Sequence, residues 1–359
     1  MLPIPYSDDV EATQPDEAAL TAEIVAHMAA TQAGHADHHR HAHRDAHAKS
    51  HAILKGRLEV ADGLPPELAQ GIFAAVTAYE VVARLSSAPG DIHSDDAPAP
   101  RGFAIKVIGA PGERLLPDLG GANQDFLMVN FPTLAFGKVQ KYLPLLKALE
   151  RASHAPGALQ RLLAATARGV EDAVEAVGGT PGATLQGLAR DRYNMLGETF
   201  HTQAAIRYGD YVAKLSLVPT GAVADLTGQV IDKGFSAMRD ALAAFFASGT
   251  ATYELRAQLQ TDREAMPVED AAILWDPELA PHQTVAHLTF ASQESYSPPR
   301  QVFGDDHLAF NPWNGVEAHR PLGSIMRIRR PAYESSSAQR HRLNNVPRVE
   351  PSALSEMPD

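Results

Sequence analysis

The sequence predicts an α+β fold, because segments with the spacing of strands alternate with longer segments that have the spacing of helices. In the strand-like segments apolar and polar residues alternate with a period of two, which is typical of half-buried strands. In the helix-like segments apolar residues recur every three or four positions. With 359 residues, 45% of them apolar, the chain can form a substantial core. Strands separated by helical insertions favour one α+β domain.

The first predicted helix spans residues 16–33, where Leu20, Ile24, Val25 and Met28 lie on one face. A last helix is expected around residues 329–340. Further helical patterns cover residues 66–79, 137–153, 157–177 and 231–248.

The clearest strand begins just after a histidine-rich tract, and its polar face carries His51, which could as easily be a surface residue. Its apolar positions are Ala52, Leu54, Gly56, Leu58 and Val60. Other strands are expected at residues 125–130, 199–208, 210–218, 252–260 and 284–292, and loops rich in Pro, Gly, Asp or Ser at 88–100 and 294–306.

Composition excludes several classes of function. The 43 acidic residues exceed the 31 basic ones, which disfavours nucleic acid and anionic membrane surfaces as partners. The absence of cysteine excludes disulfides, thiolate-ligated cofactors and iron–sulfur clusters. The first residues lack the basic and apolar regions of a secretory signal, and no apolar run is long enough to span a bilayer. The expected location is the cytoplasm.

The predicted C-terminal helix carries Arg329, Tyr333 and Arg340 at positions i, i+4 and i+11, on one face. A phenol titrates near pH ~10, and a guanidinium within hydrogen-bond reach, or a ferric ion opposite, favours its phenolate. A phenolate is the proximal iron ligand of haem catalases. The alternative is a surface helix with solvated arginines and a packed Tyr.

Four further segments carry a resemblance to a known family. His47-Ala48-Lys49, leading into a strand that ends in Glu59-Val60, resembles the distal strand of haem catalases. Residues 82–87 and 101–107 resemble the Arg-Phe-Ser segment and the Arg-Gly-Phe-Ala-Val-Lys strand of that family. Residues 310–325 are similar to the lead-in to the proximal helix of short catalase-related peroxidases. From about Arg44 to about Asn344 the chain therefore resembles the haem catalase superfamily, in its short peroxidase branch.

The resemblance implies an antiparallel β-barrel with surrounding helices, and haem b between the barrel and a C-terminal proximal helix. It also implies an N-terminal arm and helix over residues 1–34, and one haem core over residues 35–359 without an additional C-terminal domain. Small members of the superfamily suggest a homodimer, although no interface is recognisable in the residues.

Roles for individual residues follow from the same resemblance. Tyr333 would ligate the ferric iron, and Arg329 would moderate the charge of the phenolate. His47 would move protons on the distal side, with Ser86 holding its other ring nitrogen and Asn130 orienting the peroxide. Arg44, Arg84 and Arg340 would bind the haem propionates, and Tyr142 would pack above the porphyrin.

Three positions depart from the family pattern. Asn130 lies one residue further from Asp125 than expected, so a register slip or bulge would be needed to aim it at the iron, and Asn123 is the alternative. Ala46 and Leu134 replace bulkier residues, which predicts a roomier distal pocket and slow catalase turnover.

The histidine tract has two interpretations of its own. It could chelate a divalent metal, since imidazole is a common metal ligand, or it could be a solvated polar segment. Only His47 falls within the catalase-like frame. The tract consists of His35, His38, His39, His41, His43, His47 and His51.

The predicted function is a haem-dependent peroxidase that uses hydrogen peroxide or an organic hydroperoxide to oxidise small organic donors, with weak catalase activity. The alternatives are a compact monofunctional catalase, a non-enzymatic haem-binding or sensing protein, and a metal-binding protein that uses the histidine tract without haem.

Overall fold

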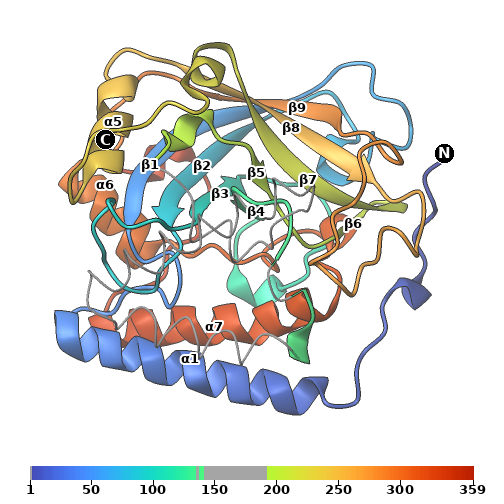
Figure 1. Ribbon diagram of the computed structural model, residues 1–359, viewed down its shortest axis with the longest axis horizontal. Helices are drawn as coiled ribbons and strands as arrows, with labels where there is room; N and C mark the ends of the chain where they lie inside the picture. Colours follow the sequence, from blue (N-terminus) through green and yellow to red (C-terminus); the bar gives the residue numbers. More distant parts are fainter. Residues whose placement is uncertain (1, 135–136, 141–191) are drawn as a thin grey trace, which may run out of the picture.

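The computed structural model describes residues 2–134, 137–140 and 192–359, and its centre is a closed antiparallel barrel (Figure 1). The strands of the sheet follow the order β5-β4-β3-β2-β1-β9-β8-β7-β6, and a further pairing of β5 with β7 closes eight of them into a ring. The antiparallel barrel that the catalase resemblance implies is thus confirmed. The strands are β1 (Ser50–Val60), β2 (Ala78–Ser87), β3 (Arg101–Val107), β4 (Gln124–Val129), β5 (Phe200–His201), β6 (Ile206–Tyr208), β7 (Tyr211–Thr220), β8 (Ala251–Leu259) and β9 (Gln283–Phe290).

Alternate side chains of the strands fill the barrel with apolar and aromatic groups. Ala83 and Leu85 of β2 point inward and join the main core cluster. Phe103 of β3 meets Phe200 and Tyr253 edge-on, with ring centroids 5.2 and 5.5 Å apart. Edge-to-face contact is a favoured geometry for aromatic pairs and adds to the hydrophobic gain of burial. The barrel is therefore a packed core, and a ligand has to bind outside it.

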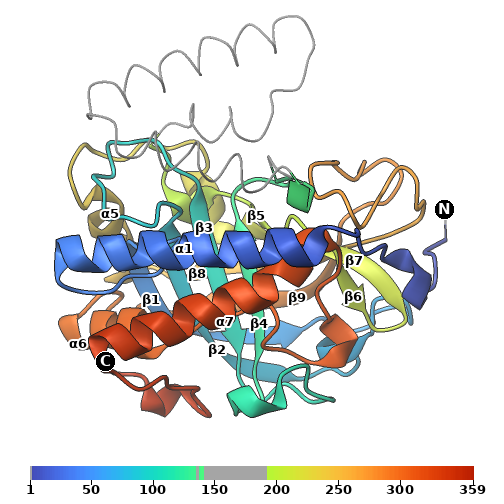
Figure 2. The ribbon, with the colours of Figure 1, turned by 90° about the horizontal axis from the view of Figure 1, so that it is seen from below.

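Two long helices cover one side of the barrel. Figures 1 and 2 show α1 (Glu17–His39) and α7 (Ser324–Asn344) side by side below the sheet. The Arg327 guanidinium of α7 binds Glu17 of α1, and also Glu11 and Glu269. Two shorter helices, α5 (Ala237–Phe246) and α6 (Pro298–Val302), flank the start of β1. None of the described helices is both long and apolar enough to cross a membrane.

Several predicted elements are shifted or wrong. Residues 66–79 do not form a helix: Gly71 has a φ of 56°, and a short 3-10 turn, η2 (Gly71–Phe73), precedes β2. The expected loop at 294–306 contains α6, whose first two residues are prolines, a common helix start, and then a π-helical turn, η6 (Phe303–His307). The single strand expected at 199–208 is two strands, interrupted near Gln203, whose φ is 63°.

Other predictions are confirmed with shifted ends. The helix expected at 16–33 continues to His39, and the one at 231–248 shortens to α5. The helices expected at 137–153 and 157–177 lie outside the described residues, apart from residues 137–140. The expected division at residue 34 falls inside α1, and the two-part organisation stays a prediction.

The start of β1 also differs from the prediction. Apolar and polar faces alternate at its C-terminal end, but Ser50–Leu54 are buried on both faces. His51, whose exposure the pattern left open, is 0% exposed. The pairing with β2 shifts register between Ser50 and Ala52, so His51 is the extra residue of a β-bulge. Its Nε2 lies 2.7 Å from Ser87 Oγ.

A histidine at one end of the barrel makes stability sensitive to pH. His319, in the turn η7 (Glu317–His319), is 1% exposed, and its ring packs against Phe73 and Tyr208. Its Nε2 accepts a hydrogen bond from the backbone N–H of Ile72 at 3.1 Å. Burial lowers the pKa of His319 to about 3.

We predict that acidification destabilises the fold through this residue. The folded pKa lies below the ordinary value, so the contribution is complete above pH ~6.5 and is lost as the pH falls toward the folded pKa. Between pH ~7.5 and pH ~5 this amounts to about 2 kcal/mol of unfolding free energy. His319→Gln keeps an acceptor for Ile72 but cannot titrate, so it should lose about 2 kcal/mol less than the wild type over this interval. Urea unfolding at both pH values measures the difference, and an equal loss in both proteins would contradict the assignment.

Candidate functional site

Most residues that the sequence proposed for the site lie on four segments of the described chain. Arg84 and Ser86 lie on β2, and Arg44 and His47 lie in the segment before β1. Asn130 directly follows β4, and Arg329, Tyr333 and Arg340 lie on α7. Ser86 and Arg84 of β2 alternate with Ala83 and Leu85, which point into the core, so both polar side chains project outward. Ser86 pairs across the sheet with Gly102 of β3. Strand alternation thus places the polar groups of β2 toward the helices that cover the barrel.

His47 lies three residues before β1, against this outer face. Its Nδ1 is 3.1 Å from Ser86 Oγ, the contact that the resemblance implied. A Cβ added to Gly102 would lie 2.5 Å from two ring atoms of His47, so only glycine lets the imidazole rest on the strand. His47 has a φ of 56°, an uncommon backbone conformation for histidine, and its N–H donates to the Ala88 carbonyl at 2.8 Å. The ring is therefore held by backbone, strand and serine together.

The electrostatic surroundings keep His47 neutral. Burial is the largest cause, and the positive charges of Arg84, Arg329 and Arg44 add to it, which lowers the pKa of His47 to about 3. The sequence argument had assumed the ordinary value near ~6.5. At neutral pH the imidazole is unprotonated, as a proton acceptor must be, and carboxylates bound beside the arginines would bring its pKa back up.

Three arginines from distant parts of the chain converge on residues 304–308. Arg84 Nη2 lies 2.9 Å from Asp305 Oδ1, and Arg44 Nη1 lies 3.4 Å from the same oxygen. Arg340 donates to the carbonyls of Asp306 at 2.7 Å and Leu308 at 2.9 Å. Burial and mutual repulsion lower the pKa of Arg340 to about 10 and that of Arg44 well below its usual range. The nearby Asp306 carboxylate already binds His41 at 2.8 Å, so the cluster favours a further anionic group.

Tyr333 lies on α7, half-buried, and its hydroxyl makes no hydrogen bond to any described residue. Burial is the largest effect and raises the pKa of Tyr333, Arg329 lowers this pKa, and the Asp45 carboxylate raises it. Arg340 is turned toward residues 304–308 and is not among the groups that set the Tyr333 pKa, so Arg329 is the guanidinium that acts on the phenol. Because Arg329 lowers the pKa of His47 as well, one cation lies within electrostatic range of both side chains.

Asn130 and Asn123 lie at opposite ends of β4. Asn130 follows Val129, the partner of Gly102, and therefore lies at the same end of the sheet as His47. Its Oδ1 accepts from the N–H of Arg101 at 2.8 Å and its Nδ2 donates to Glu198 at 3.0 Å. The register between β3 and β4 is regular from Gly102 to Val107, so this pairing does not contain the slip or bulge that would be needed to aim Asn130. Asn123 donates to Glu350 at 2.7 Å, away from His47.

The remaining predicted positions contribute no described contact to His47. Tyr142 lies outside the described residues. Ala46 is exposed, and Leu134 packs in a buried cluster with Ile325 and Met326. Members of the histidine tract have separate partners: His39 binds Asp91, His41 binds Asp306, and His51 contacts Ser87. Within the described ranges no three metal-ligating side chains are grouped as a metal site.

Residues that the sequence argument missed complete the site. Asp305 organises the arginine cluster, yet it lies in a segment predicted to be a loop. Gly102 makes room for His47, but the sequence marked it only as part of a strand. Neither role could be found locally, because each depends on a side chain more than 50 positions away along the chain.

The described residues include the donor groups that a haem would need. The Tyr333 hydroxyl is free to ligate, and the Ser337 hydroxyl, one turn further along α7, is buried without a hydrogen-bond partner. Three guanidinium groups on one side suit two propionate carboxylates. On the opposite side His47 offers Nε2, which has no partner among the described residues.

Comparison with known proteins supports the fold. No protein-family model matches the sequence, and no curated protein is significantly similar to it. The structure is similar to a fungal catalase, with a TM-score of 0.60 and 16% identity over 89% of this chain and 65% of that one. It is also similar to catalase A from Saccharomyces cerevisiae, with a TM-score of 0.59 and 16% identity over 87% of this chain and 65% of that one. The chain has the catalase fold and spans just under two thirds of the length of these catalases.

Proposed function

We propose that the protein is a haem-dependent peroxidase that uses hydrogen peroxide or an organic hydroperoxide to oxidise small organic donors, with weak catalase activity. The observation that carries the proposal is the set of three groups that lie on the outer face of the barrel, on α7 and at the arginine cluster. His47, fixed by Ser86, lies on the barrel side, and Tyr333 lies on the helix side. The catalase fold supports the same conclusion.

In this proposal haem b is held from two directions. Tyr333 would hold the ferric iron through its phenolate oxygen, and Arg329 would stabilise this phenolate against the opposing effect of burial. Arg44, Arg84 and Arg340 would bind the propionates through their planar guanidinium groups. When bound, the haem would supply the redox chemistry that cleaves peroxide and oxidises a donor.

The protein's own part is proton transfer and orientation. In the tautomer that this proposal requires, Nδ1–H of His47 would donate to Ser86 Oγ, which would leave a lone pair on Nε2. His47 Nε2 would take the proton from one peroxide oxygen and return it to the other, so that water leaves. Asn130 would hold the outer oxygen through the amide N–H that does not bind Glu198.

Two alternatives share this site. A compact monofunctional catalase would use the same groups with a second hydrogen peroxide as donor, and the named structural neighbours favour it. A haem-binding or sensing protein would bind haem without turnover. The three functions differ in what happens after peroxide is added to the haem-loaded protein.

The first prediction concerns ligation. Tyr333→Phe removes the phenol oxygen and should either lose haem or change the Soret and charge-transfer bands, because the chain has no cysteine to replace the ligand. Tyr211→Phe, which removes a phenol oxygen from β7, is the matched control and should leave the spectrum unchanged. Absorbance spectra of the purified, haem-loaded proteins test this. An unchanged spectrum in Tyr333→Phe would refute the ligand assignment.

The second prediction concerns proton transfer. His47→Ala should keep haem, since the imidazole does not ligate iron, and should slow the reaction with peroxide by ~10²–10⁴-fold. Stopped-flow absorbance measures the rate. His38→Ala, elsewhere in the tract and on the exposed part of α1, should react as fast as the wild type. A loss below ~10-fold in His47→Ala would point to His43 or His51 as the acid–base group.

The third prediction separates peroxidase from catalase. At equal enzyme and peroxide, oxidation of a small phenol should exceed oxygen release, because donor and second peroxide compete for the same oxidised enzyme. Parallel assays with an oxygen electrode and an absorbance readout of the oxidised phenol measure both. Oxygen release with kcat/KM approaching ~10⁸ M⁻¹s⁻¹, together with indifference to phenols, would establish the compact catalase instead.

A further inference from the structure

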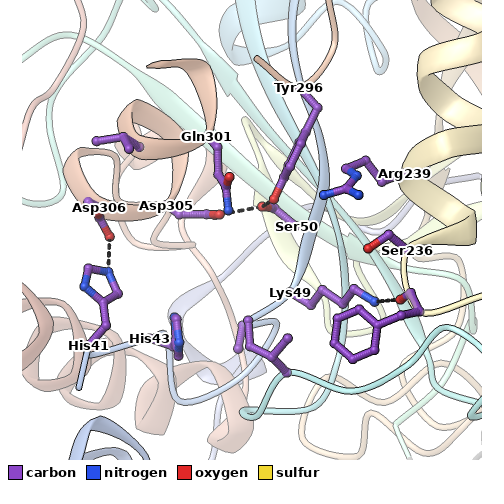
Figure 3. A pocket seen from close by; sticks show the side chains of 14 residues that line it. His41, His43, Lys49, Ser50, Ser236, Arg239, Tyr296, Gln301, Asp305 and Asp306 are labelled. Atoms are coloured by element: carbon purple, nitrogen blue, oxygen red, sulfur yellow. Dashed lines mark hydrogen bonds and ion pairs between the residues drawn. The ribbon is translucent and has the colours of Figure 1, made fainter. Parts of the chain in front are cut away.

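A pocket of about 370 Å³ lies beside the arginine cluster, between the start of β1, the helices α5 and α6, and η6 (Figure 3). Pockets for small organic ligands have volumes in this range. Neither His47 nor Tyr333 lines it. Figure 3 shows Tyr296, Arg239, Asp305 and Lys49 around its centre.

One part of the pocket wall is apolar and partly open to solvent. Phe235 is 58% exposed and Val302 is 49% exposed, and both line the pocket with Ile92. The ring of Tyr296 completes this wall. Large apolar side chains gathered at a concave site and left open to water favour a ligand that covers them, and a flat aromatic ring matches the aromatic members of the wall.

Most charged groups of the pocket already have partners. Asp305 binds Arg84 and Arg44, and Asp306 binds His41. Lys49 Nζ lies 2.7 Å from Asp95 Oδ1 and is also bound by backbone carbonyls, one of them that of His93 at 2.8 Å. These pairs leave little net charge to attract a ligand.

Arg239 differs from these groups. Its ion pair with the neighbouring Asp240 is long, with 3.4 Å between Arg239 Nε and Asp240 Oδ1, and both side chains are well exposed. Its terminal nitrogens make no hydrogen bond to any residue in the described part of the chain. The guanidinium carbon lies 5.3 Å from the centre of the Tyr296 ring. The pocket therefore offers a cation next to an aromatic wall, a combination that suits an aromatic carboxylate.

A short chain of hydrogen bonds joins the pocket to the arginine cluster. The Tyr296 hydroxyl lies 3.2 Å from Ser50 Oγ, which donates to Asp305 Oδ2 at 2.5 Å. The other oxygen of Asp305 lies 2.9 Å from Arg84 Nη2. A ligand in the pocket would thus be separated from the proposed propionate site by the side chain of Asp305.

We propose that this pocket binds the reducing donor, a small phenol that carries a carboxylate, with its ring on Phe235, Val302 and Tyr296 and its carboxylate on Arg239. The proposal rests on the peroxidase function proposed above. In each cycle two donor molecules, ArOH, each give up one electron and one proton, so that H₂O₂ and two ArOH become two H₂O and two phenoxyl radicals. The donor is oxidised at the edge of the site where the arginines would hold the propionates, and it need not enter the space around His47.

Binding is tested first with vanillate, by calorimetry on the haem-loaded protein. Arg239→Gln should weaken binding of vanillate about tenfold, the usual effect of removing one charge-assisted hydrogen bond from a partly exposed site. Guaiacol, which lacks the carboxylate, should bind the wild type more weakly and should not respond to this substitution. Val302→Trp, which fills the pocket, should abolish binding of both. Arg57→Gln and Val76→Trp alter exposed residues elsewhere and should bind as the wild type does.

Turnover then tests the role of the pocket. In Val302→Trp, peroxidase turnover with vanillate should fall at least tenfold, while the rate of reaction with peroxide in the absence of donor should match that of the wild type. The proposal would be overturned if the wild type does not bind vanillate, or if Arg239→Gln and Val302→Trp leave its binding unchanged. Neither outcome would affect the results for Tyr333 and His47. If the protein takes up no haem but binds vanillate in the predicted pattern, the binding site is upheld. Its role as a donor site is then overturned.

Discussion

The alternation of side chains along β2 and β3 is the constraint on which the rest of the structure depends. Phe103 and Leu85 point inward and close the core of the barrel, while Ser86 and Gly102, their neighbours along the strands, face outward under His47. A register slip of one residue would exchange the two faces and would lose the core and the site together. The core of the barrel and the site therefore require the same strand register.

Charge compensation is the second condition that the fold has to meet. Buried guanidinium groups are costly unless carboxylates or carbonyls meet them, and Asp305 with the carbonyls of residues 304–308 provides these partners. The π-helical turn η6 presents these carbonyls to Arg44 and Arg340. This requirement links the segment before β1, the strand β2 and the end of α7, which are far apart along the chain.

The same cluster connects the proposed haem site with the neighbouring pocket. Arg84 lies within electrostatic range of His47 on one side and binds Asp305 on the other. Asp305 in turn reaches Tyr296 through Ser50. A change of charge at the arginines would therefore alter the electrostatic potential at His47, the group that would move protons. It would also alter the potential at Tyr296, in the wall that would contact a donor. In the proposed function, the donor would therefore bind beside the arginine cluster and not next to His47.

The sequence by itself determined the features that depend on local pattern: the strands with a period of two, the helices α1 and α7, and the placement of His47 and Ser86 in segments that resemble known ones. Only the tertiary structure decided that residues 66–79 turn at Gly71, that His51 is buried in a bulge, and that Arg340 meets residues 304–308 and leaves Tyr333 to Arg329. Local periodicity reports which face of an element is apolar. It carries no information about which distant carboxylate or carbonyl will meet a buried charge, because that partner is set by how the barrel and helices pack.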